Sequence, residues 1–188
     1  MHDDGCCAGC SAAKVGQAAP EFTMKTTADL ENFSSTVSLH DYHGKWLVLF
    51  FYPYDFSYIC PTEIRALSDH YDDFVGLGAD ILGVSTDSLY VHRAWLRTPR
   101  EQDGIGELRY LLASDGSRRV SQDYGVLVEE EGVALRGLFI IDPDGLLQYA
   151  VVHNADVGRS VDETLRVLEA LQSGAMCPMD WKPGQQTL

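Results

Sequence analysis

Two kinds of apolar pattern alternate along the first half of the chain. Continuous apolar runs of strand length, at residues 45–52 and 79–86, are typical of buried strands. Each run is followed by a segment whose apolar residues recur at helical spacing, the first extending from Pro61 to Gly76 and the second from Ser88 to Arg97. This alternation of strands and helices predicts an α/β fold.

The second half of the chain adds a hairpin and a closing helix. The apolar runs 133–141 and 146–152 are joined by an Asp-Pro-Asp-Gly turn, which predicts a pair of antiparallel strands. Ser160 and Glu163 have the spacing of a capping box, so the last long helix is predicted at 160–172. The central sheet should therefore be mixed, with helices flanking it.

The composition suits one globular domain with short tails. Hydrophobic residues make up 45% of the 188 residues, which is enough for a full core. We expect the domain at residues 15–172, between a cysteine-rich, flexible N-terminal tail at 1–14 and a C-terminal arm at 173–188.

The charge and the apolar pattern exclude several kinds of partner. A net charge of −14 opposes binding to phosphate backbones and anionic headgroups, so neither nucleic acid nor a membrane is expected. The longest purely apolar run, Trp46 to Tyr52, is too short to span a bilayer, and the first residues lack the pattern of a secretory signal. A cytoplasmic protein is the resulting expectation.

The five cysteines are spread too unevenly for a secreted disulfide framework. Cys60 lies at the predicted start of a helix, where unpaired backbone N–H groups stabilise a thiolate, and Pro61 takes the first helical position without wasting a donor. The alternative is that Cys60 is merely a small buried hydrophobic residue. Its place at a helix start favours a reactive thiol.

The neighbours of Cys60 narrow the chemistry. A dithiol oxidoreductase would carry a second cysteine in a CxxC motif, whereas Cys60 is followed by Pro-Thr-Glu. Ser57 is near enough in sequence for its hydroxyl to bind a ligand oxygen. Glu63 suits the positive end of the helix dipole, but its negative charge disfavours a thiolate, so the site requires compensating cations.

A second group of cysteines, Cys6, Cys7 and Cys10, lies in the N-terminal tail. Cys7 and Cys10 have CxxC spacing, which allows zinc or iron–sulfur ligation, but a closed site needs about four ligands and only His2 is nearby. A tail with no dedicated role is the preferred interpretation, followed by auxiliary redox exchange and then by metal binding.

The residues around Cys60 resemble a known family. The segment FYPYDFSYICPTE, Phe51 to Glu63, is similar to the peroxidatic-cysteine motif of the peroxiredoxins, PxxxTxxC followed by PTE. Four further segments resemble the typical 2-Cys group, which includes alkyl hydroperoxide reductase C, and the likeness extends from about residue 15 to residue 184. They are DSLYVHRAW at 87–95, RGLFIIDPDG at 136–145, VGRSVDETLR at 157–166 and CPMDWKPG at 177–184.

The resemblance implies a thioredoxin-like fold and a role for each matching residue. It makes Cys60 the peroxidatic cysteine and Cys177 the resolving cysteine. Five more residues would complete the site: the shielding Pro53, the hydroxyl of Ser57, the thiolate-contacting Arg136, and the supporting pair Glu63 and Arg159. Fixed guanidinium and hydroxyl donors suit this chemistry because they stabilise the charge that develops on the leaving oxygen.

Arg159 is notable on physical grounds as well. A cation directly before the Ser160 cap opposes the helix dipole, so a specific partner is expected to hold Arg159 in place. Arg136, in contrast, would by itself be interpreted as a solvated charge at a strand edge.

The reaction cycle implied by the resemblance requires partners. Cys60 is oxidised to a sulfenic acid, and Cys177 of a second subunit condenses with it to a disulfide. An external dithiol, from a thioredoxin-like protein or a flavoprotein disulfide reductase, then reduces that bond. A homodimer is implied, and dimers of this family often assemble into rings such as decamers. No cofactor and no metal is expected at the site.

Two other classes of function are weighed against the peroxidase. A metal-binding protein would use the cysteine tail, and a ring-forming holdase chaperone would bind unfolded clients independently of Cys60. Neither explains why Cys60, Arg136 and Arg159 occur together. His43, His92 and His153 are interpreted as structural or exposed, although His153 borders the Arg159 segment.

The chain also departs from the family pattern. Ser57 lacks the methyl group of the usual threonine, which loosens its rotamer, and the segment 171–177 is a few residues shorter than usual, which puts the reach of Cys177 in question. Residues 103–106 read DGIG where oxidation-sensitive members have GGLG, and the chain ends at Leu188 without their C-terminal YF helix.

These departures predict fast disulfide formation and resistance to overoxidation. Titration with excess hydrogen peroxide, followed by measurement of the protein mass, checks the prediction. The mass should show a disulfide, and ready conversion of Cys60 to a sulfinic acid would contradict the expectation.

Overall fold

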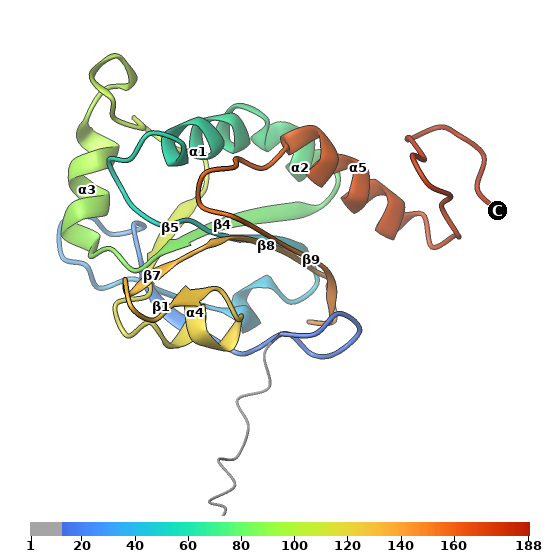
Figure 1. Cartoon of the computed structure of the whole chain (residues 1–188), viewed down its shortest axis with the longest axis horizontal. Helices are drawn as coiled ribbons and strands as arrows, with labels where there is room; N and C mark the ends of the chain where they lie inside the picture. Colours follow the sequence, from blue (N-terminus) through green and yellow to red (C-terminus); the bar gives the residue numbers. More distant parts are fainter. Residues whose placement is uncertain (1–12) are drawn as a thin grey trace, which may run out of the picture.

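The computed structural model describes residues 13–188, which form a mixed seven-stranded sheet between two layers of helix and loop (Figure 1). The strand order is β2-β1-β5-β4-β3-β8-β9. The strands are β1 (Thr23–Thr26), β2 (Thr36–Ser38), β3 (Trp46–Phe51), β4 (Ala79–Ser85), β5 (Leu111–Ser114), β8 (Arg136–Ile141) and β9 (Leu147–His153). A separate two-stranded ribbon pairs β6 (Leu127–Val128) with β7 (Val133–Ala134).

The strand directions confirm the mixed sheet expected from the sequence. β3, β4 and β5 are parallel neighbours, whereas β8 runs antiparallel to both β3 and β9. The tight turn between β8 and β9 has Gly145 at φ 83°, and Asp142 Oδ1 accepts hydrogen bonds from two backbone amides of the turn. The predicted hairpin is therefore confirmed, with β9 at the edge of the sheet.

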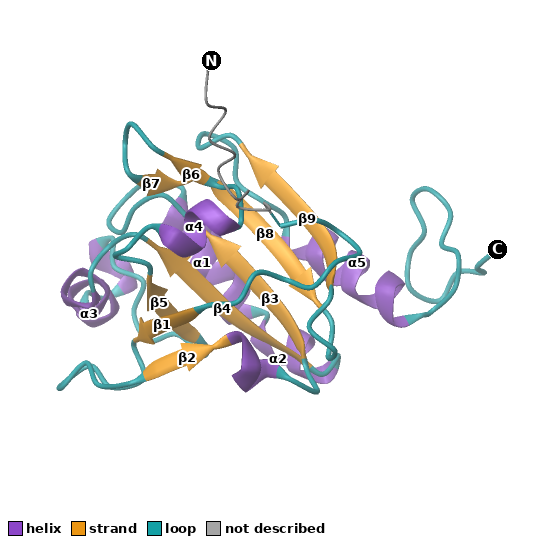
Figure 2. Ribbon diagram, turned by 90° about the horizontal axis from the view of Figure 1, so that it is seen from below, coloured by secondary structure: helices purple, strands orange, loops and turns teal. Residues whose placement is uncertain are grey.

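The helices cover the two faces of the sheet unequally. α1 (Cys60–Asp69), α2 (Tyr71–Gly76) and α5 (Val161–Gln172) lie on one face, and the short α4 (Arg119–Asp123) lies on the other (Figures 1 and 2). α3 (Leu89–Arg97) contributes Trp95, which is fully buried on the same side as α1. Two 3-10 turns, η1 (Leu39–Tyr42) and η2 (Arg100–Gln102), complete the fold.

Each face of the sheet has its own apolar core. Side chains of β3 alternate between them, so Leu47 and Leu49 belong to one core while Val48 and Phe50 belong to the other. The second core, which joins β3 and β8 to α1 and α5, also contains the fully buried Cys60. Cys60 is thus placed by core packing as well as by its helix.

The structure corrects three details of the sequence-based expectations. The helix expected up to Gly76 is interrupted at His70, which separates α1 from α2. At this point Asp73 N–H donates to the His70 carbonyl, an i to i+3 hydrogen bond of the 3-10 type. The run 133–141 is divided between β7 and β8. Ser160 caps α5, since its hydroxyl accepts from Glu163 N–H (3.2 Å). The reciprocal bond of a capping box is not formed, because the Glu163 carboxylate pairs with Arg166 and not with the backbone N–H of Ser160.

The tight packing of β4 against its neighbours gives a test of the fold. A Cβ atom at Gly83 would lie 2.7 Å from Leu112 Cδ2 and 2.8 Å from Phe50 Cζ. Gly83→Ala should lower the free energy of unfolding by about 1–3 kcal/mol because it overpacks this layer. Gly76→Ala is the control, since a Cβ there meets nothing within 4 Å. Chemical denaturation of both variants measures the effect, and equal stability would contradict the packing described.

Candidate active site

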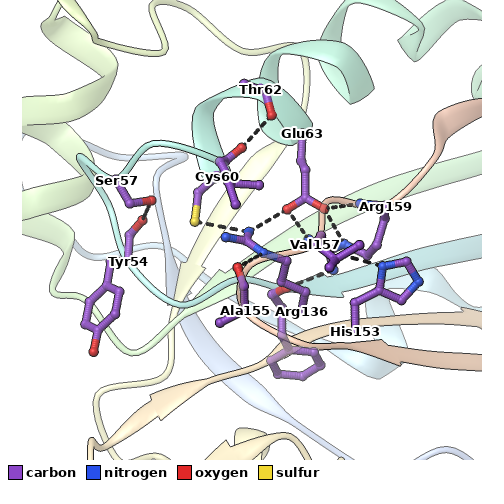
Figure 3. A network of polar contacts seen from close by, with 12 residues as sticks. Tyr54, Ser57, Cys60, Thr62, Glu63, Arg136, His153, Ala155, Val157 and Arg159 are labelled. Atoms are coloured by element: carbon purple, nitrogen blue, oxygen red, sulfur yellow. Dashed lines mark hydrogen bonds and ion pairs between the residues drawn. The ribbon is translucent and has the colours of Figure 1, made fainter.

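Cys60 is the first residue of α1, and its side chain is fully buried. Pro61 follows as the second helical residue, and no side chain caps this end of the helix; the amides of Thr62 and Glu63 both bond the carbonyl of Ile59. The predicted position of Cys60 at a helix start is therefore confirmed. Arg136 Nη1 lies 3.3 Å from Cys60 Sγ and donates a hydrogen bond to it (Figure 3).

The Glu63 carboxylate lies one helical turn from Cys60 and binds two arginines (Figure 3). Arg136 Nη1 donates to Glu63 Oε2 at 2.7 Å. Arg159 donates three times, from Nη2 to Oε2 (2.9 Å) and from Nε and its backbone N–H to Oε1 (2.8 and 2.7 Å). All three side chains are nearly fully buried, so the cations that Glu63 requires are supplied within the protein.

Arg159 is held by more than its ion pair. Its Nη1 donates to the carbonyl oxygen of Phe51 at 2.8 Å and to that of Gly137, which belong to β3 and β8. The guanidinium carbon also lies 5.3 Å from the centre of the Phe50 ring, within range of a cation–π contact. These contacts are the partners expected for a cation placed against the dipole of α5.

This buried cluster carries one excess positive charge beside the sulfur. Arg136 and Arg159 carry two positive charges, and Glu63 carries one negative charge. Burial by itself would raise the pKa of Glu63, but the hydrogen bonds and charge of Arg159, and then the charge of Arg136, outweigh it and keep the pKa below its ordinary value of 4.5.

The loop before Cys60 contains the other two residues suggested by the motif. Pro53 is buried at the end of β3. Ser57 is half-buried and donates its hydroxyl to the Tyr54 carbonyl at 3.0 Å, which leaves the oxygen free to accept a further hydrogen bond (Figure 3). Phe56 adopts a positive φ of 52° and places its ring 5.7 Å from that of Trp95.

A buried polar cluster beneath this loop was missed from the sequence. Asp55 accepts hydrogen bonds from the hydroxyl of Tyr52 (2.9 Å) and pairs with Nδ1 of His92 (2.7 Å). Burial raises the pKa of Asp55, against the opposing hydrogen bond and charge of His92. His92 lies three residues before the buried Trp95 in α3, and that helical spacing was the available signal that His92 faces inward.

Cys177 lies apart from this cluster. It is half-buried on the C-terminal arm, and its sulfur contacts Ser173 Oγ at 3.5 Å and the carbonyls of Ala170 and Ala175. The arm extends beyond α5, away from the sheet (Figures 1 and 2). Within residues 13–188, no contact joins Cys177 to Cys60.

Other features bear on metal and membrane binding. The part of the chain that the structure describes contains no group of three or more His, Cys, Asp or Glu side chains arranged to hold a metal ion. Cys6, Cys7 and Cys10, for which metal ligation was considered, lie outside the described residues. None of the helices between residues 13 and 188 combines the length and apolar character needed to cross a bilayer.

Glu63→Gln tests the buried ion network. It should lower the free energy of unfolding by about 3–5 kcal/mol because two buried guanidinium groups lose their counter-charge. The lowered pKa of Glu63 also sets the pH dependence: the stabilisation by Glu63 is complete above pH 4.5 and is lost as the pH falls through the folded-state pKa. Denaturant unfolding across this pH range measures the free energy of unfolding and its pH dependence.

Glu107→Gln, at an exposed position, is the control and should change neither the free energy of unfolding nor its pH dependence. Equal free energies of unfolding for the two variants at every pH would contradict the ion network.

Comparison with known proteins agrees with this geometry. The model of the AhpC/TSA family matches residues 15–150. The Bacillus subtilis protein YkuU, which carries a peroxiredoxin name, is 56% identical over 176 residues, covering 93% of this chain and 97% of its own. Peroxiredoxin-2 of Mus musculus is 49% identical over 180 residues, covering 94% of this chain and 90% of its own.

A solved structure supports the same assignment. The reduced 2-Cys peroxiredoxin of Plasmodium vivax matches with a TM-score of 0.87 at 39% identity, over 92% of this chain and 91% of that one. The thioredoxin-like fold expected from the sequence is thereby confirmed. The chain belongs to the AhpC/TSA family, and it is a peroxiredoxin, a peroxidase that works through a thiol.

Proposed function

We propose that Cys60 is the peroxidatic cysteine and that it reduces hydrogen peroxide and organic hydroperoxides. The Cys60 thiolate attacks one oxygen of ROOH, the O–O bond breaks, and the leaving alkoxide or hydroxide takes up a proton. Cys60 gains the attacked oxygen as a sulfenic acid, and the peroxide is reduced to an alcohol or to water. The observation that carries the proposal is the single Arg136 guanidinium nitrogen that bonds both Cys60 Sγ and the Glu63 carboxylate.

The neighbouring residues have complementary roles in this proposal. Arg136 stabilises the thiolate and the charge that develops on the leaving oxygen. Ser57 binds the peroxide, since its hydroxyl oxygen retains acceptor capacity beside its bond to Tyr54. Pro53 shields the thiolate from water. Glu63 and Arg159 act through Arg136 by fixing its position.

Resolution of the sulfenic acid is assigned to Cys177 of a partner subunit. Condensation of the two groups forms a disulfide and releases water. An intersubunit step fits the absence of contact between the two sulfurs within residues 13–188 of one chain. The division proposed from the sequence has a tail at 1–14, a domain at 15–172 and an arm at 173–188. An intersubunit step fits this division, because the arm extends away from its own domain (Figure 1).

Two surfaces support assembly of the protein. β9 is an edge strand, and beyond Leu147, whose backbone bonds Gly16 and Gln17, its outer side is available to pair with the β9 strand of a second copy. The loop before Cys60 carries three exposed aromatic side chains, which provide a second contact for rings of dimers such as a decamer: Tyr54, Phe56 and Tyr58. The reductant in this cycle is an external dithiol, from a thioredoxin-like protein or a flavoprotein, in the cytoplasm.

Two cysteine variants test the catalytic cycle. Cys60→Ser should abolish peroxide consumption with a dithiol reductant, because the proposal assigns the attacking sulfur to Cys60. Cys177→Ser should still consume about one equivalent of peroxide per chain in a single turnover, but it should form no disulfide-linked dimer on a non-reducing gel. An active Cys60→Ser protein would refute the proposal, and a disulfide-linked dimer in Cys177→Ser would move resolution to another cysteine.

A further inference from the structure

The turn between β9 and α5, residues 154–158, contacts one arginine of the active site, Arg136, and leads directly into the other, Arg159. The carbonyl of Ala155 accepts a hydrogen bond from Arg136 Nε at 2.7 Å. The turn ends at Arg159, whose backbone N–H donates to Glu63 Oε1 at 2.7 Å. Gly158 also lies close to the start of α1, since a Cβ there would be 3.5 Å from Ile59 Cγ2. The orientation of both guanidinium groups therefore depends on the shape of this turn.

The turn is closed by three hydrogen bonds near its base. Asn154 accepts from Asp156 N–H through its side chain (2.9 Å) and from Val157 N–H through its carbonyl (3.1 Å). The third contact joins His153 Nδ1 to the Val157 carbonyl at 3.3 Å. Because a carbonyl oxygen can only accept, this contact requires the proton on Nδ1. It links the end of β9 to a residue two positions before Arg159.

His153 is well placed to act on the site without being part of the core. It pairs directly with Arg136 in the register of β8 and β9, so the two side chains leave the same face of the sheet. Figure 3 shows its ring beside Val157, on the opposite side of Arg136 from Cys60. The side chain is only partly buried, so little apolar burial depends on it.

We propose that His153 is a positioning residue for the peroxidatic reaction. By donating from Nδ1 to the Val157 carbonyl, it fixes the 154–158 turn and thereby the orientation of Arg136 and Arg159. The inference rests on the proposed role of Cys60 as the attacking thiol, and it assigns His153 no contact with the peroxide.

Three substitutions separate the hydrogen bond from the size of the side chain. His153→Leu keeps a similar volume but has no donor. His153→Asn places an N–H donor on Cγ, as Nδ1 is placed in histidine. His40→Ala is the control, because His40 is an exposed histidine in the η1 turn.

The readouts are the rate of Cys60 reaction with hydrogen peroxide, the rate of Cys60 alkylation by iodoacetamide, and the thermal unfolding midpoint. Alkylation is followed by mass spectrometry of the Cys60 peptide. His153→Leu should slow both reactions roughly fivefold, the factor expected for the loss of one hydrogen bond of about 1 kcal/mol. His153→Asn should restore most of both rates, while His40→Ala should match the parent.

Three results would overturn the inference. The first is parental rates in His153→Leu. The second is equal loss in His153→Leu and His153→Asn, which would assign the effect to the ring and not to its donor. The third is a fall in the unfolding midpoint that accounts for the slower rates. Failure of the proposed function would look different, because the parent protein itself would then react slowly with peroxide.

Discussion

The carboxylate of Glu63, placed between two arginines, is the interaction on which the active site depends. Its partners are far away in sequence: Arg136 is 73 residues distant and Arg159 is 96 residues distant. The carboxylate therefore joins the first turn of α1 to β8 and to the turn that leads into α5. Neither arginine could remain buried without it, because an unpaired charge in a protein interior is strongly destabilising.

This arrangement also fits the reactivity proposed for the buried Cys60 thiol. Cys60 is fully buried, a position in which most cysteines are inert. Here the two guanidinium groups leave one positive charge unbalanced by Glu63, and the sulfur lies 3.3 Å from the nearer of them. The helix N-terminus adds its own partial positive charge at the same point. The environment is therefore preorganised for a thiolate and for the oxyanion that leaves when the thiolate reacts.

The elements that could be predicted from the sequence are those specified by local pattern. The buried strands β3 and β4, the hairpin turn before β9 and the start of α1 at Cys60 are encoded by consecutive residues. The short strands β1, β2 and β5 were not identified because three or four residues carry too little periodicity, and they form only by pairing within the sheet.

The site was predictable only in part, for a related reason. Arg136 by itself suggests a solvated charge, because the sequence around it does not reveal that Glu63 and Cys60 lie beside it; the family motif supplied that connection. The Asp55–His92 pair was missed since no motif joined its members across 37 residues. The surroundings of Cys177 in the proposed disulfide could not be predicted from one chain, because its proposed partner, Cys60, belongs to another subunit.

The most direct test of this account is to identify which sulfur the peroxide oxidises first. The parent protein is treated with one equivalent of hydrogen peroxide in the presence of dimedone, which traps sulfenic acids, and each cysteine peptide is examined by mass spectrometry. The account predicts a dimedone adduct on Cys60 and none on Cys177. An adduct on Cys177 or on a cysteine of the N-terminal tail, with Cys60 unmodified, would contradict it.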